Sequence, residues 1–189
     1  MPPQEKYEAR FYFISELTLR KNLADALQYI TQLAGLYVIH ENENELRISF
    51  CKTIIIYTAS IIEACLHFCL KHKITEDIFE KPEWKYVDTK LIYKIPQTGE
   101  EIVSARRIRV RNKINFRHIK FQQLNKICLD RGILNKNLFD MCEKIKDLRN
   151  KIHLANLSTP DRKYSKKHID EVFEIASNVL STIERELTS

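Results

Sequence analysis

Glycine is scarce in this chain: only Gly35, Gly99 and Gly132 occur among 189 residues. Because these three glycines are isolated, a glycine-rich loop that cradles phosphates is excluded. All-β and α/β folds generally need more turn residues than this, so the composition favours helices. The chain is 44% hydrophobic and 30% charged, which is typical of a soluble globular protein. We therefore expect one mostly helical domain spanning residues 1–189.

Common catalytic motifs are absent too, since the sequence contains no HExxH, GxSxG or CxxC pattern. Its cysteines are odd in number, lie in apolar stretches and follow no signal-like segment. We interpret them as reduced core thiols in a cytoplasmic protein. The five cysteines are Cys51, Cys65, Cys69, Cys128 and Cys142.

A metal site is the one alternative that the cysteines suggest. Helical spacing places Cys65, Cys69 and His72 on one face, but no second group of ligands follows at a zinc-like spacing. We therefore expect no metal and no cofactor.

Acidic residues are missing from one window, which runs from Ile102 to Leu129 and carries eight cations. Without these eight, the remaining 23 basic residues balance the 25 acidic ones, so the net charge of +6 is a local feature. Such a concentration of charge is typical of a polyanion-binding surface, although a merely solvated basic face is the alternative. Six of the cations are our candidate RNA-binding residues: Arg106, Arg107, Arg109, Arg111, Lys113 and Arg117.

The same region predicts a β-hairpin at about residues 85–111. Apolar and polar residues alternate from Val87 to Ile95 and again from Ile102 to Arg111, with the turn sequence Pro-Gln-Thr-Gly-Glu between them. Strand periodicity places Arg107, Arg109 and Arg111 on one face at a spacing of about 6.6 Å, which suits successive phosphates of a nucleic-acid strand. Four aromatic residues flank the basic stretch and are either base-stacking residues or packing residues of the hairpin and helices: Tyr86, Tyr93, Phe116 and Phe121.

Helical periodicity predicts the remaining elements. We expect three helices at about residues 5–34 (ended by Gly35), 46–72 and 116–130. A fourth helix should begin at an Asn135 cap and run through the motif described below, and a fifth should run from a Ser165 cap to about residue 187.

The second helix, at about residues 46–72, is apolar on almost every side, which raises a membrane-spanning interpretation. It carries Lys52, Glu63 and His67, which are costly inside a bilayer, so we interpret it as a central buried helix and expect no membrane. The fold class is therefore all-α: an up-and-down bundle of about five helices with one inserted hairpin.

The candidate catalytic residues lie in the string Arg149-Asn150-Lys151-Ile152-His153. If the helix continues through this string, Arg149 and His153 lie one turn apart on the flank of its apolar stripe, and Asn150 faces outwards. An arginine can bind a phosphate with two donors, and a histidine can transfer a proton near neutral pH. The other interpretation is structural: a boundary arginine and histidine that cap neighbouring carbonyls.

Several segments together resemble the HEPN domain family (higher eukaryotes and prokaryotes nucleotide-binding). The string LRNKIH followed by one more amphipathic helix resembles the family's C-terminal signature. The segment YTASIIEACLHFCL resembles its apolar early helix, with Glu63 where members carry an acidic residue. KINFRHIKFQQLNKICLDRGIL is similar to the short helix and turn before the signature helix. The resemblance covers the chain from about residue 46 onwards.

The resemblance implies a function as well as a fold. Many members are metal-independent endoribonucleases of toxin–antitoxin or phage-defence systems, with a composite site at a homodimer. It implies that Arg149 binds the scissile phosphate, that His153 acts as general base or acid, and that Asn150 positions the substrate or the histidine. RNA, a second copy of the chain, and an antitoxin or nucleotidyltransferase are the partners implied.

The chain departs from the family pattern in two ways. Three residues separate Arg149 from His153, where the usual pattern has four to six. Some members carry a tyrosine two residues after the histidine, which a partner nucleotidyltransferase can adenylylate, whereas this chain has Ala155. The alternative function is therefore a catalytically silent HEPN module that binds RNA, nucleotide or a protein partner. A purely structural adaptor that dimerises through its apolar helix faces is a third hypothesis.

Overall fold

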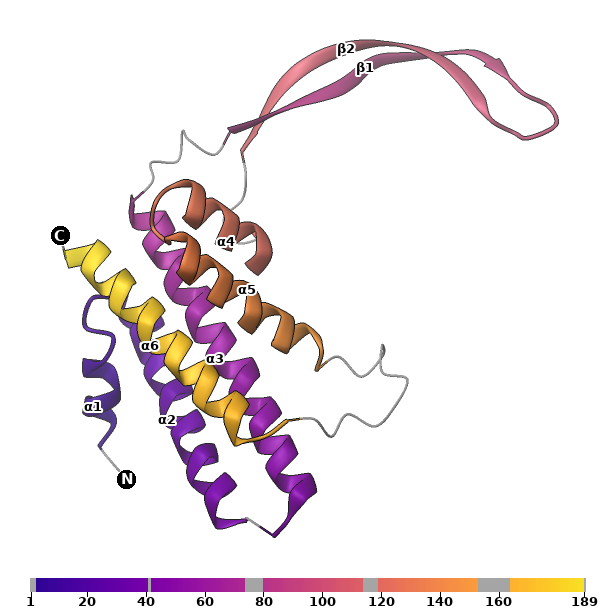
Figure 1. Cartoon of the computed structure of the whole chain (residues 1–189). Helices are drawn as coiled ribbons and strands as arrows, with labels where there is room; N and C mark the ends of the chain where they lie inside the picture. The colour runs from indigo at the N-terminus through magenta and orange to yellow at the C-terminus, as the bar shows by residue number, and fades with distance from the viewer. Residues whose placement is uncertain (1–2, 41, 74–79, 114–118, 153–163, 189) are drawn as a thin grey trace. The chain divides into compact units, whose positions relative to one another are not determined.

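The structure is a computed structural model that describes residues 3–40, 42–73, 80–113, 119–152 and 164–188; for residues 80–83 and 111–113 it describes the backbone alone. The chain divides into two compact units. The first, Met1–Lys73 with Lys120–Ser189, is helical, and the second, Ile74–Ile119, holds a β-hairpin. Figure 1 labels the elements of both units.

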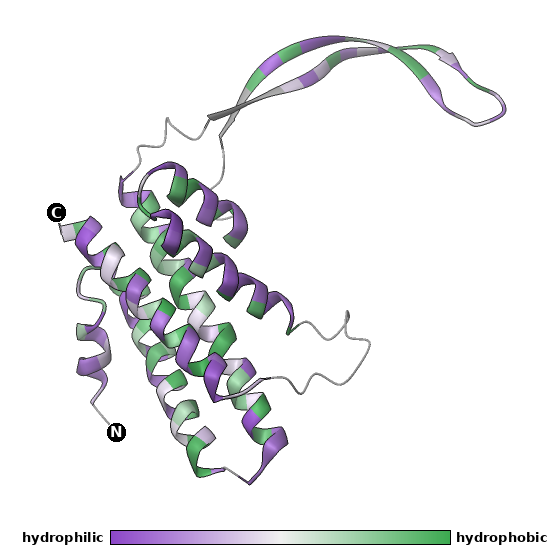
Figure 2. Ribbon diagram, in the orientation of Figure 1, coloured by the Kyte–Doolittle hydropathy of each residue, from purple (hydrophilic) through white to green (hydrophobic). Residues whose placement is uncertain are grey.

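The helix α3 (Asn44–Lys73) is the centre of the helical unit. It contacts α2, α4, α5 and α6, and Figure 2 shows it green, that is apolar, along most of its length. Ile54, Ile55, Ile62 and Leu66 are fully buried. Isoleucine is a modest helix former, so burial against four neighbours rather than intrinsic propensity stabilises this helix. The prediction of a central buried helix is confirmed.

The N-terminal segment differs from its prediction. Two helices, α1 (Gln4–Ala9) and α2 (Leu17–Ile39), replace the single helix expected there. The intervening turn is held by Arg20, whose guanidinium donates to the carbonyl oxygens of Tyr12 and Ile14. Gly35 lies inside α2 and does not end it, because a glycine that keeps helical dihedral angles costs only about 1 kcal/mol relative to alanine.

Three further helices complete the unit: α4 (Phe121–Asp130), α5 (Lys136–Asn150) and α6 (Lys166–Thr188). As predicted, Gly132 follows α4 in a left-handed conformation, with φ of 72°. Asn135 caps α5, since its side-chain oxygen accepts a 2.9 Å hydrogen bond from the Leu138 amide. The α4 helix begins at Phe121 and not at Phe116, which lies outside the described residues.

The hairpin comprises β1 (Glu80–Lys94) and β2 (Glu101–Lys113), paired antiparallel. Gly99 has φ of 73° in the connecting turn, and the Ile95 amide donates to the Glu100 carbonyl oxygen, so the predicted turn is confirmed. The strands extend beyond the predicted limits at both ends. The register shifts between Val87 and Lys90, where Asp88 adopts φ of 55°, which marks a β-bulge.

The described chain is thus mostly helical, with six helices and one two-stranded hairpin. By length and composition α3 alone, among the described residues, is able to cross a membrane. However, 56% of its most apolar window is buried within the helical unit, which is compatible with a soluble protein.

Candidate functional site

Arg149 lies in the last turn of α5, at the border between core and solvent. The helix buries Leu138, Cys142 and Ile145, and the Arg149 side chain remains 35% exposed. A cation in the last turn is favourable there, because the helix C-terminus carries a partial negative charge. The position is thus half-shielded, as predicted from the sequence.

The partner of Arg149 is Glu63 on α3. The Arg149 Nη1 atom donates a 2.6 Å hydrogen bond to Glu63 Oε2, and the Glu63 side chain is 23% exposed. Because both groups retain contact with water, a pair of this kind contributes only about 0–1 kcal/mol to stability. Its larger effect is geometric, since a carboxylate that engages one edge of a guanidinium fixes the direction of the remaining donors.

Sequence reasoning did not predict this pair. The pairing of Glu63 with a cation on another helix depends on the packing of α3 against α5. No local sequence signal identifies the pair, because the two residues lie on different helices and are 86 positions apart in the chain.

The C-terminal end of α5 differs from its prediction. The helix ends at Asn150, and Lys151 and Ile152 form a turn, so the expectation that the helix continues through the whole motif is wrong. Asn150 is exposed, as expected. His153 lies outside the described residues, and its predicted position one turn from Arg149 therefore stays a prediction.

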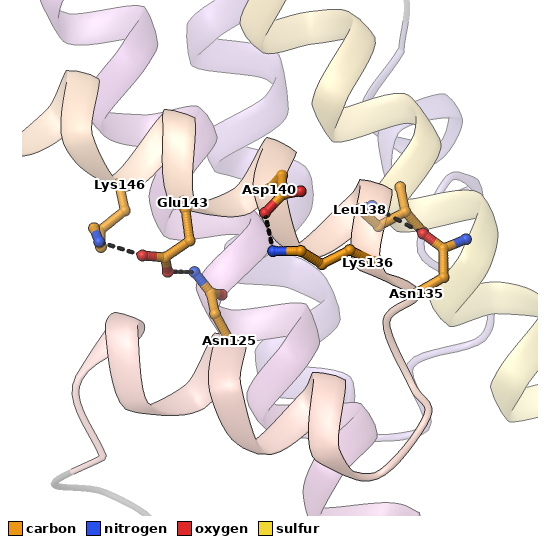
Figure 3. Close-up of polar contacts among 7 residues, drawn as sticks. All are labelled: Asn125, Asn135, Lys136, Leu138, Asp140, Glu143 and Lys146. Atoms are coloured by element: carbon orange, nitrogen blue, oxygen red, sulfur yellow. Dashed lines mark hydrogen bonds and ion pairs between the residues drawn. The ribbon is translucent and has the colours of Figure 1, made fainter.

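A polar network fixes α5 against α4 one turn before Arg149 (Figure 3). Asn125, which is fully buried, donates a 2.8 Å hydrogen bond to Glu143 Oε1, and the Lys146 ammonium donates to Glu143 Oε2. This second hydrogen bond is the main reason that the pKa of Lys146 is raised. The side-chain amide oxygen of Asn125, Oδ1, is buried without a hydrogen-bond partner in the described part of the chain. Glu143 and Lys146 are therefore paired with each other, and the ion-pair partner of Arg149 is Glu63.

The hairpin has two chemically different faces, because directly paired residues of an antiparallel ladder project to the same side. Tyr86 pairs with Arg107, Trp84 with Arg109, and Pro82 with Arg111. We call Trp84, Tyr86, Arg107 and Arg109 the aromatic–arginine face. On it the Arg107 guanidinium carbon lies 4.6 Å from the Trp84 ring centroid and 6.0 Å from that of Tyr86. Such an exposed cation–π contact is worth about 0.5–1 kcal/mol.

Arg106 projects from the opposite face, where it pairs with Val87. Its guanidinium lies 3.2 Å from a carboxylate oxygen of Asp88, the residue in the bulge. The structure therefore separates Arg106 from Arg107 and Arg109. Of the other predicted RNA-binding residues, Arg111 and Lys113 are described by their backbone alone, and Arg117 lies outside the described residues.

Trp84 was missed by the sequence analysis, because the strand was expected to begin near Val87. A signal was present: Trp84 and Tyr86 alternate with the charged residues Glu83 and Lys85, but out of phase with the alternation that begins at Val87. Two other aromatic residues that were candidates for base stacking lie in different environments. Phe121 is only 5% exposed and packs in the helical unit, whereas Tyr93 is exposed and pairs with Ile102 on the face that carries Arg106.

All five cysteines are buried and free, in agreement with the interpretation as core thiols. Burial raises the pKa of Cys51 and Cys69 to about 11 and that of Cys142 to about 12, so these thiols are protonated and unreactive near neutral pH. Among the described residues, no three histidine, cysteine or carboxylate side chains are grouped so that they could hold a metal ion.

Comparisons with protein-family models, with curated proteins and with solved structures found no match to this chain.

Proposed function

We propose that this protein is a metal-independent endoribonuclease of HEPN type, a cytoplasmic component of a toxin–antitoxin or phage-defence system. The observation that carries the proposal is the hydrogen bond between Arg149 and Glu63. It joins the two segments whose sequences resemble the family, and a carboxylate that orients the arginine suits a residue that binds phosphate. A mostly helical bundle is also the fold class that the family implies.

In the proposed reaction, the ribose 2′-oxygen attacks the adjacent phosphorus and the bond from phosphorus to the 5′-oxygen breaks. His153 removes the proton from the 2′-hydroxyl, and a second imidazole gives a proton to the leaving 5′-oxygen. Arg149 stabilises the charge that develops on the phosphate oxygens, and Asn150 positions the substrate. The products are a 2′,3′-cyclic phosphate and a free 5′-hydroxyl, and no metal is consumed or required.

A homodimer is part of the proposal. One chain supplies one Arg149 and one His153, whereas the reaction uses an acid and a base together. Two copies about a two-fold axis supply both, and an isologous contact needs only one self-complementary surface.

The test is cleavage of total RNA by the purified protein in the presence of EDTA. We expect fragments with 2′,3′-cyclic phosphate ends, and we expect His153→Ala to abolish them. His40→Ala is the matched control, because His40 forms an exposed pair with Glu43 at the end of α2. Intact RNA at high protein concentration, or full activity in His153→Ala, would refute the nuclease.

The second candidate is a catalytically silent HEPN module that binds RNA, nucleotide or a protein partner. The three-residue spacing between Arg149 and His153 favours it, since the family pattern has four to six. RNA binding that weakens steeply with salt but yields no cleavage would support this alternative.

A further inference from the structure

We propose that the aromatic–arginine face of the hairpin binds single-stranded RNA by stacking unpaired bases on Trp84 and Tyr86. This inference rests on the proposed function for the choice of RNA as the nucleic acid. It goes beyond the predicted phosphate contacts, because it assigns a base-binding role to Trp84 and a preference for unpaired strands to the hairpin.

Both rings are open to a ligand. Trp84 is 53% exposed and Tyr86 is 68% exposed, although they are among the largest apolar side chains of the hairpin. They project from a sheet of only two strands. Large rings that are held on one face without burial are typical of a binding surface. Stacking tolerates every base, because each base has a π-face.

Arg107 prepares this surface for a base. Its guanidinium already lies over the Trp84 ring at 4.6 Å, within reach of Tyr86 as well. A guanidinium is planar and stacks on aromatic rings with one side, which leaves the other side for a nucleobase. A base can therefore extend the stack of Trp84 and Arg107 without breaking an existing hydrogen bond of the arginine.

The charges of the same face suit the phosphates of the bound strand. Arg109 pairs with Trp84 in the ladder and is exposed, so a cation stands beside the ring that receives the base. The nearby carboxylate of Asp88 is engaged by Arg106 and belongs to the other face. Residues two apart on a strand are about 6.6 Å apart, so successive rings and cations can follow an extended strand.

Duplex RNA does not suit this face. Its bases are already stacked on each other, and its major groove is too deep and narrow for protein side chains to read. A duplex would offer phosphates to the arginines but no π-face to Trp84. The geometry therefore points to a preference for unpaired RNA.

Trp84 is the only tryptophan of the chain, so its fluorescence reports on this face alone. The experiment titrates the His153→Ala variant, which lacks the proposed proton-transferring side chain, with a single-stranded RNA of about twelve nucleotides, within the usual site sizes. An abasic oligomer of equal charge and a duplex of equal length serve as comparisons. We expect strong quenching with the single strand and little with the other two. Equal quenching by all three would overturn the proposal.

A second measurement uses labelled RNA and fluorescence anisotropy. We expect Trp84→Ala to weaken single-strand binding on the order of tenfold and Trp84→Phe to retain most of it. Tyr93→Ala is the matched control, because Tyr93 has the same 53% exposure on the same strand but lies on the other face. Unchanged affinity in Trp84→Ala would overturn the assignment.

The two proposals fail independently. Quenching by single-stranded RNA without cleavage by the wild-type protein would refute the nuclease and leave the stacking face intact. Cleavage by the wild-type protein without preferential quenching would do the reverse.

Discussion

Arg149 donates a 2.6 Å hydrogen bond to Glu63, although 86 positions separate the two residues in the sequence. The contact connects the last turn of α5 to the middle of α3 and holds the arginine in one direction at the edge of the core. A structural role and the proposed catalytic role of Arg149 both depend on this contact, and the first two predictions distinguish between them.

We expect Glu63 and Arg149 to be coupled only weakly in stability. In a double-mutant cycle with Glu63→Gln and Arg149→Met, the coupling free energy should be about 0.5–1 kcal/mol, because both side chains are partly exposed. Urea unfolding of the four proteins measures it. A coupling of several kcal/mol would indicate a buried structural pair rather than an oriented functional one.

Arg149→Ala should abolish RNA cleavage while leaving RNA affinity within about twofold of wild type, because a contact made mainly with the transition state contributes little to ground-state binding. Single-turnover cleavage and binding of an uncleavable RNA measure the two effects. Lys136→Ala is the control, since it removes an exposed cation in the first turn of the same helix and leaves the site unchanged. A parallel loss of affinity would show that Arg149 acts in binding alone.

Replacing Arg107, Arg109 and Arg111 together with alanine should weaken RNA binding across all sequences. It should also reduce the magnitude of the slope of log affinity against log salt concentration by about 2, because each phosphate contact of a single strand contributes about 0.7 to that slope. Filter binding at several salt concentrations measures this. Arg106→Ala should change the slope least, because Arg106 is already paired with Asp88 on the other face. An affinity equal to wild type at every salt concentration would make the hairpin a solvated insertion.

The protein should be a homodimer at micromolar concentration, formed through α5 and its neighbour α3. Ile56 is exposed on α3 and lies two helical turns before Glu63 on the same face. Ile56→Lys should therefore shift the protein to monomer in light scattering, whereas Leu17→Lys, at an exposed position at the start of α2, should not. A monomeric wild-type protein would contradict the composite site.

The buried thiols should make the protein sensitive to alkali. Burial raises the pKa of Cys51 and Cys69 from 9.0 to about 11, so in the folded state these thiols keep protons that the unfolded chain loses. The contribution of these two thiols to the free energy of unfolding should thus be constant below about pH 9 and fall as the pH rises towards about 11, by at most about 1.4 kcal/mol per pH unit for each thiol. Urea unfolding at several pH values measures the slope. A flat profile up to about pH 11 would show that these thiols titrate alike in both states.

The sequence by itself determined the elements whose pattern is local. The continuous apolar run of α3, the alternation and turn of the hairpin, the Asn135 cap and the stop at Gly132 all follow from residue types at fixed spacing. The helical fold class follows in the same way from scarce glycine and helical periodicity. Several boundaries shifted, because the ends of an element depend on a few marginal residues, and the single N-terminal helix that was expected is two helices, α1 and α2.

Tertiary structure decided which residues meet. Glu63 and Arg149 carry no sequence signal for each other, because their contact depends on how α3 packs against α5. Trp84 and Arg109 share a face only through the strand register, which the bulge at Asp88 shifts beyond that point. Gly35 remains inside α2 because a local propensity cost of about 1 kcal/mol is small beside the burial of a helix face. The candidate functional residues could thus be identified from the sequence, whereas the contacts that orient their side chains depend on the tertiary structure.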